Sequence, residues 1–300
     1  MSFRNEAYSD LIDDVLFDAF YTDRSNRGVI ASIRQFAEVI VRKILDFPES
    51  EKVTLGDRVV LEKLRQASGD NQTLMSSINN IRIIGNKCTH TQETGPITDQ
   101  DVLDCKDNLL SLYASLFVIY FKKYEFGTNS EVMNAFSILP PVIRYMCLNE
   151  LYQHNKSNLS LIDKLSLVLL KAFDKEQAVR WVEERKEELS NVLPYTEEAI
   201  EKYKKEVGND FAQSIIENAP ASMYVVCMDR IIEVDEIIRK NGLLYNNFEQ
   251  AKGLYLTKGV LKGSSDEVVD FNSLMAFVYL GRIDEGNPKV ASIDSYTIIK

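Results

Sequence analysis

The residues with the greatest capacity for chemistry are three polar side chains that recur every four positions, Arg82, Asn86 and His90. If this stretch is helical, the three side chains lie on one face, because positions four apart differ in direction by only about 40°. A histidine exchanges protons near neutral pH, and an arginine neutralises a developing negative charge. The same spacing is also typical of a solvated helix face without a catalytic role.

Gly85 occupies the middle of this predicted helix, where glycine costs about 1 kcal/mol relative to alanine. A close approach by another backbone or a ligand can explain such a residue, and an ordinary packing contact is as common. Ile81, Ile84 and Cys88 fall on a different face at helical spacing and are expected to pack against neighbouring helices. The helix therefore should combine a polar face with a packed one.

The composition is that of an ordinary globular protein with an acidic balance: 300 residues, 45% hydrophobic, 27% charged and a net charge of −10. Its lysines and arginines form only short clusters, which argues against extended duplex-DNA binding and leaves room for a small nucleic-acid site. No apolar run reaches about 18 residues, and the N-terminus lacks a signal-peptide pattern. We therefore expect a cytoplasmic protein with no membrane partner.

The chain shows no pattern that predicts a metal or a cofactor. Its four cysteines are far apart and are interpreted as buried residues in a reducing compartment. Neither a His-Glu-x-x-His motif nor a phosphate-binding glycine loop is present. His154, the second of two histidines, is expected in an exposed loop.

Five amphipathic helices are predicted before residue 127, at residues 5–21, 27–47, 54–67, 73–89 and 99–124. Thr98, with acidic residues after it, is a typical helix start. The last of the five helices has an apolar stripe wide enough to be buried on two sides. On the second, Arg34, Glu38 and Arg42 recur every four residues, a pattern typical of surface ion pairs.

The polar residues 127–130 predict a boundary between an N-terminal domain, 1–127, and a C-terminal domain, 128–300. The second domain is expected to be mostly helical, including a helix at 224–240. After Gly253, three short β-branched or aromatic runs predict a small β element, at residues 254–256, 275–280 and 296–299. The expected fold class is therefore mainly α: a helical bundle followed by a helical region with a small β element near the C-terminus.

The N-terminal two-fifths of the chain resembles HEPN domains. The resemblance rests on the five predicted helices, on Arg34-x-x-x-Glu38 in the second, and on Arg82-x-x-Gly85-Asn86-x-x-x-His90 in the fourth. More narrowly, it is similar to a bacterial HEPN-like branch of unknown function found on restriction and other defence proteins. That branch continues with an Ile-Thr-x-x-Asp helix start, which residues 97–101 match.

The resemblance implies a metal-independent ribonuclease that acts as a homodimer and uses no cofactor. His90 would then be the general acid and base, Arg82 or Lys87 would stabilise the phosphorane, and Asn86 would position the phosphate. Gly85 would lie near the two-fold axis and permit close approach of the two helices. The expected partners are a second copy of the chain and RNA.

The sequence departs from the family pattern at one position, because active members usually carry an arginine where this chain has Gly85. Many HEPN-like domains only bind RNA or other proteins. The alternative is therefore a non-catalytic dimerisation and protein-interaction module that binds another protein of a defence system. In that case Glu38 would pair with Arg82 and make this arginine structural.

Overall fold

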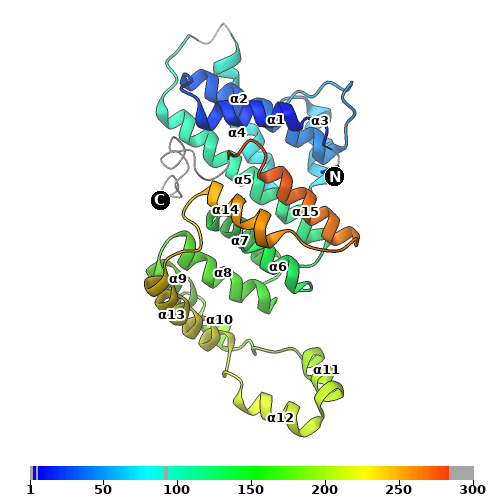
Figure 1. The fold of residues 1–300 in the computed structure, drawn as a ribbon, viewed down its shortest axis with the longest axis vertical. Coiled ribbons are helices and arrows are strands. Elements are labelled where there is room, and N and C mark those ends of the chain that lie inside the picture. Colours follow the sequence, from blue (N-terminus) through cyan, green and yellow to red (C-terminus); the bar gives the residue numbers. More distant parts are fainter. Residues whose placement is uncertain (1–2, 5, 91–93, 284–300) are drawn as a thin grey trace. The chain divides into compact units, whose positions relative to one another are not determined.

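The computed structural model describes residues 3–4, 6–90 and 94–283, and within these ranges the chain contains helices and no strand (Figure 1). The prediction of a mainly α fold is therefore confirmed. Contacts divide the chain into two compact units. The first unit combines the residues up to Cys147 with those from Tyr245 onward, and the second unit is Leu148–Leu244. This division differs from the boundary expected at residue 127.

The first unit begins with the five helices expected from the sequence and adds elements from late in the chain. These are α1 (Ser9–Tyr21), α2 (Asn26–Leu45), α3 (Arg58–Ala67), α4 (Gln72–Thr89), α5 (Asp99–Lys123), α6 (Ser130–Phe136), α14 (Phe248–Leu254), the π-helical turn η1 (Tyr255–Gly259) and α15 (Asp266–Val278). α7 (Pro141–His154) crosses the division. As expected, Thr98 begins α5: its hydroxyl accepts a hydrogen bond from the Asp101 N–H in a capping box.

α2 is the central helix of the bundle and packs against α1, α3, α4 and α5. Its buried residues lie on nearly all sides, as expected of a helix surrounded by others. The core of the bundle includes fully buried residues of α2, α4 and α5, namely Phe36, Ile40, Ile81, Leu112 and Leu116. Ile84, which was also expected to pack against neighbouring helices, is only half-buried.

α5 is buried on two sides, as its wide apolar stripe predicts, and aromatic contacts account for much of that burial. The Phe117 ring meets Phe136 of α6 edge-on at 5.4 Å, and Tyr120 lies 5.6 Å from Phe271 of α15. α15 also supplies Phe277, which stacks on Phe36 of α2 at 5.6 Å. The late helices thus complete the core of the N-terminal bundle, so a boundary at residue 127 would cut through it.

The chain leaves α15 along the surface of α1. Gly281 has a left-handed φ of +69°, and its N–H donates to the Asp13 carboxylate at 2.5 Å. A Cβ at this glycine would lie 2.4 Å from the Cβ of Leu16. The next residue, Arg282, is buried with its guanidinium 4.0 Å from the ring centres of both Phe20 and Phe248. These contacts fix the end of the described chain to the start of the bundle.

The predicted β element is wrong where the structure describes it. Residues 275–280 belong mainly to α15, which begins at the N-cap Ser265, and residues 254–256 continue α14 into η1. A short continuous apolar run fits a buried strand or a buried helix equally well, and α15 is apolar because its neighbours cover it. The third run, 296–299, lies outside the described residues.

The second unit is also helical, and α13 packs against its neighbours α8, α9 and α10. Its helices are α8 (Leu159–Ala172), α9 (Lys175–Glu183), α10 (Lys186–Ser190), α11 (Glu197–Val207), α12 (Asn209–Asn218) and α13 (Met223–Asn241). α13 confirms the helix predicted at 224–240. None of the helices in the described ranges combines the length and apolar character needed to cross a membrane.

Candidate functional site

α4 carries the residues expected to do chemistry, and its last turn determines how they are arranged. The helix begins where the Asn71 side chain accepts from the Leu74 N–H, and it ends at Thr89. Asn86 is half-buried, and its carbonyl accepts from the His90 N–H at 3.1 Å. His90 is the extended C-cap residue and is exposed. Its ring is therefore open to a ligand at the end of α4, one turn beyond Asn86.

Arg82 points away from that end of the helix. Its Nη2 donates to the Asn79 side chain at 2.8 Å, and its stem packs over Gly56 in the loop before α3. Long side chains in a helix lean toward its N-terminus, so an arginine on α4 covers the turn before its own position. Arg82 is therefore directed away from Asn86 and His90, although the three residues were expected to lie on one face.

Arg34 of α2 accounts for the glycine in the middle of α4. Its stem crosses α4 at Gly85, where an added Cβ would lie 2.7 Å from the Arg34 Cδ and 3.2 Å from its Cβ and Cγ. Alanine would have to displace this side chain, so the cost of a helical glycine is offset by the close approach of a neighbour within the same chain. This contact within one chain explains the glycine, and it does not depend on a two-fold axis.

Glu38 lies opposite Arg34 and not opposite Arg82, which corrects the pairing expected from the sequence. The Glu38 Oε1 and Arg34 Nε are 3.6 Å apart, one helical turn apart on α2. Burial raises the pKa of the Glu38 carboxyl, although Arg34 and Arg42 act in the opposite direction. The ion pair was visible in the sequence as a four-residue spacing and was read there only as surface charge.

The guanidinium of Arg34 reaches the last turn of α4. Its Nη1 donates to the Thr89 hydroxyl at 2.7 Å, and that hydroxyl donates to the Gly85 carbonyl at 3.1 Å. Thr89 is the residue before His90, so a cation from a second helix is bound at the last turn of α4, next in sequence to the predicted acid–base group. Sequence reasoning missed Arg34 as a member of this site. Gly85 was the signal that could have found it, because it marked a place where something approaches α4 closely.

Arg27 holds the start of the connection between α4 and α5. Its guanidinium donates to the Lys87 carbonyl and, at 2.6 Å, to the Gly95 carbonyl. Arg27, at the start of α2, contacts the Lys87 carbonyl near the end of α4. The stem of Arg34, further along α2, lies against Gly85, which is earlier on α4, so the two helices run antiparallel. The Lys87 ammonium faces the Asp101 carboxylate at 4.0 Å. Lys87 therefore lies within reach of a carboxylate of α5.

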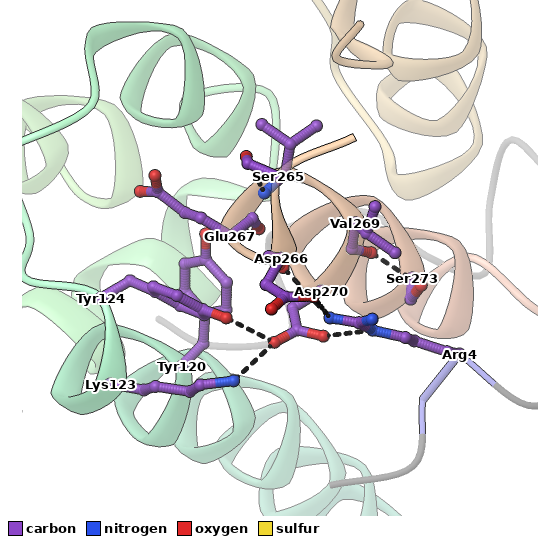
Figure 2. A network of polar contacts seen from close by, with 11 residues as sticks. Arg4, Tyr120, Lys123, Tyr124, Ser265, Asp266, Glu267, Val269, Asp270 and Ser273 are labelled. Atoms are coloured by element: carbon purple, nitrogen blue, oxygen red, sulfur yellow. Dashed lines mark hydrogen bonds and ion pairs between the residues drawn. The ribbon is translucent and has the colours of Figure 1, made fainter. Parts of the chain in front are cut away.

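A second polar cluster, which the sequence did not predict, joins the N-terminal segment to α5 and α15 (Figure 2). Asp270 is at its centre and accepts hydrogen bonds from Arg4 at 2.6 Å, Tyr124 at 2.8 Å and Lys123 at 2.9 Å. Arg4 also pairs with Asp266 at 2.8 Å. These groups line a cavity of about 420 Å³. Because the cations and carboxylates pair with each other, we interpret the cluster as a structural clasp.

Asp270→Asn should destabilise the first unit by about 2 kcal/mol at neutral pH. Burial alone would raise the pKa of this carboxyl, but hydrogen bonds from Lys123, Arg4 and Tyr124 outweigh it and hold the pKa at about 2, below its ordinary value of 3.8. The ionised group therefore stabilises the folded state above about pH 4, and this stabilisation is lost as the pH falls toward 2. The magnitude follows from about 1.4 kcal/mol per pKa unit.

Urea unfolding of wild type and Asp270→Asn at pH 7, 4 and 3 measures this effect. The difference in free energy of unfolding between the two proteins should shrink as the pH falls. Protonation removes the negative charge of Asp270 in the wild type, and the substitution has already removed it in the variant. A difference that stays constant with pH would mean that the Asp270 charge is not responsible.

Within the described residues, no three His, Cys, Asp or Glu side chains come together as a set of metal ligands. The cysteines are free thiols; Cys105, Cys147 and Cys227 are buried, and Cys88 is half-buried. His154, expected in a loop, is instead the last residue of α7, with its Nδ1 2.8 Å from the Glu150 carbonyl.

No protein-family model matches the chain, and no curated protein or solved structure is significantly similar to it. The resemblance to HEPN domains rests on the residues of α2 and α4 and stays a prediction.

Proposed function

We propose that the chain binds RNA at the end of α4 and cleaves it without a metal ion, with His90 as the group that moves protons. One observation carries the proposal: Asn86 and the exposed His90 share the end of α4 with the Arg34 guanidinium, which donates to Thr89. The site thus offers an amide, an imidazole and a cation within about one helical turn. The similarity of α2 and α4 to HEPN motifs points to RNA as the substrate.

The chemistry follows from these side chains. A neutral His90 takes the proton from a ribose 2′-hydroxyl, whose oxygen attacks the adjacent phosphorus. The bond to the 5′-oxygen of the next nucleotide then breaks, and the protonated His90 returns the proton to that oxygen. A nearby guanidinium stabilises the extra negative charge on the phosphorane, and the Asn86 amide orients a phosphate oxygen. The products are a 2′,3′-cyclic phosphate and a 5′-hydroxyl. DNA lacks the attacking hydroxyl.

The test is a cleavage assay with the full chain, end-labelled single-stranded RNA and a DNA of the same sequence, all in excess EDTA. We expect the RNA to be cut, the DNA to stay intact, and the 3′ ends to carry cyclic phosphate. Cleavage that needs an added divalent ion, or that leaves a 3′-hydroxyl, would overturn the proposed mechanism.

A non-catalytic dimerisation and protein-interaction module is the second candidate, and the internal pairing of cations near the motif favours it. Arg82 is bonded to Asn79, Lys87 faces Asp101, and Arg34 faces Glu38. Such a module would bind a second copy or another protein of a defence system.

If the module is the correct function, the purified chain should cut no RNA and should sediment as a dimer at tens of micromolar, roughly the range in which stable dimers persist. A monomer at that concentration that cleaves RNA would rule it out. A dimer that cleaves RNA would support the first proposal together with the expected homodimer.

A further inference from the structure

Arg34 reaches the last turn of α4 because of the direction of its own helix. Long helical side chains lean toward the N-terminus of their own helix. α2 and α4 run antiparallel, so an arginine on α2 leans toward the end of α4, where His90 lies. The same rule turns Arg82, on α4 itself, in the opposite direction. The orientation of each guanidinium therefore follows from its helix, and only that of Arg34 suits the site.

The guanidinium of Arg34 still has hydrogen-bond donors to offer. Nη1 donates to the Thr89 hydroxyl, and Nε faces Glu38 at 3.6 Å, longer than a normal hydrogen bond. Among the described residues none accepts a hydrogen bond from Nη2, and Nη2 is not one of the buried polar atoms. The side chain is 15% exposed. The aliphatic part of the side chain is thus packed, and the end of the guanidinium is open. The packing holds the cation in one place, and some of its hydrogen-bond donors stay available to a ligand.

We propose that Arg34, and not Arg82, is the phosphate-binding residue of this site, and that its ligand is the phosphodiester of a single-stranded RNA. This inference rests on the proposed function. Nη2 supplies two donors to a phosphate oxygen pair, an interaction that a guanidinium makes more strongly than a neutral donor. Because Gly85 has no side chain, the aliphatic part of Arg34 can lie against α4. The arginine that active HEPN members carry before the polar residue is thus replaced in space by Arg34 of α2.

Arg34 contacts the backbone of the nucleic acid and not its bases, so it should give affinity without sequence preference. RNA and DNA should bind with similar strength, and only cleavage should distinguish them. Each neutralised phosphate on a single strand contributes about 0.7 to the slope of log affinity against log salt. Loss of one such contact should lower the slope by about that amount.

The experiment measures binding of a fluorescent 2′-O-methyl oligonucleotide, which cannot be cleaved by its own 2′-oxygen, at several salt concentrations. The test variant is Arg34→Met with Glu38→Gln, which keeps the packed stem and leaves no unpaired carboxylate. Arg82→Met is the matched control on α4. We expect the double variant to bind about 10- to 100-fold more weakly, the range for a charge-assisted hydrogen bond, with the reduced salt slope. Arg82→Met should bind like the wild type.

Gly85→Ala is a second variant that keeps every charge. The added Cβ must displace the Arg34 stem, so binding should weaken although the helix gains a better helix former. Thermal melting establishes that each variant is folded. If wild type, the double variant and Arg82→Met bind equally, Arg34 is not the phosphate residue, while RNA binding itself stands. If Arg82→Met alone weakens binding, the assignment is reversed.

A readout independent of RNA separates failure of the inference from failure of the proposed function. With only two histidines in the chain, a His154→Asn variant identifies the His90 ring signal in a proton NMR spectrum. Inorganic phosphate should shift that signal in the wild type, but not in the double variant. If the wild type binds no oligonucleotide, the function proposal fails. No phosphate effect, or the same effect in both proteins, overturns the inference about Arg34.

Discussion

Replacement of His90 by alanine should lower RNA cleavage by about 10²- to 10⁴-fold, the usual range for loss of a positioned general acid or base. The protein should stay folded, because His90 is exposed and its ring makes no hydrogen bond to a described residue. Binding of the 2′-O-methyl oligonucleotide should change little, because the lost group acts on protons and not on affinity. The measurement is the single-turnover cleavage rate in EDTA, beside the binding isotherm.

His154→Ala is the matched control for this prediction. It removes the other histidine from the exposed end of α7 and should leave cleavage unchanged. Equal cleavage by wild type and His90→Ala would contradict the assignment of His90. Equal loss in the two variants would mean that the effect does not depend on the end of α4.

Gly281→Ala should destabilise the first unit by about 2–4 kcal/mol. The residue has a φ of +69°, which costs an alanine about 1 kcal/mol, and the new Cβ would lie 2.4 Å from the Leu16 Cβ and 3.3 Å from the Ile12 carbonyl oxygen. Neither neighbour is the tip of a flexible side chain, so α1 or the end of the chain must move. In a thermal melt this corresponds to a drop of about 5–15 °C.

Gly69→Ala separates the cost of a left-handed backbone from the cost of the contact between the added Cβ and α1. Gly69 has a similar φ of +62°, but its nearest neighbour to an added Cβ is the Lys122 Nζ at 3.7 Å, an ordinary contact. It should cost only the strain of about 1 kcal/mol. If both variants melt alike, the contact with α1 contributes nothing and the end of the chain is not packed as described.

The sequence was sufficient to predict the helices because their signals are local. Each signal depends on residues within a turn or two of the helix. Examples are the helical periodicity of the apolar side chains, the cap at Thr98 and the two-sided apolar stripe of α5. The partner of the outer side of α5 could not be predicted in the same way. It comes from residues near 271, and nothing within one helix shows which distant segment covers it.

The candidate site was predicted in part for a similar reason. Asn86 and His90 are near each other in the chain, so helical spacing places them together at the end of α4. Arg34 joins them through tertiary structure, by way of a glycine on one helix and the antiparallel direction of another. The direction in which Arg82 leans could have been predicted from helix geometry alone, since long side chains point toward the start of their helix.

The dependence of the N-terminal bundle on late helices has a consequence for synthesis. α1–α5 leave the ribosome while Phe277 and Phe271, which cover Phe36 and Tyr120, are still untranslated. At about 5–20 residues per second, that interval lasts on the order of 10–30 s. During it the nascent bundle presents an aromatic face that chaperones can bind. A chain that terminates before α15 would keep that face exposed, because Phe271 and Phe277 would be absent.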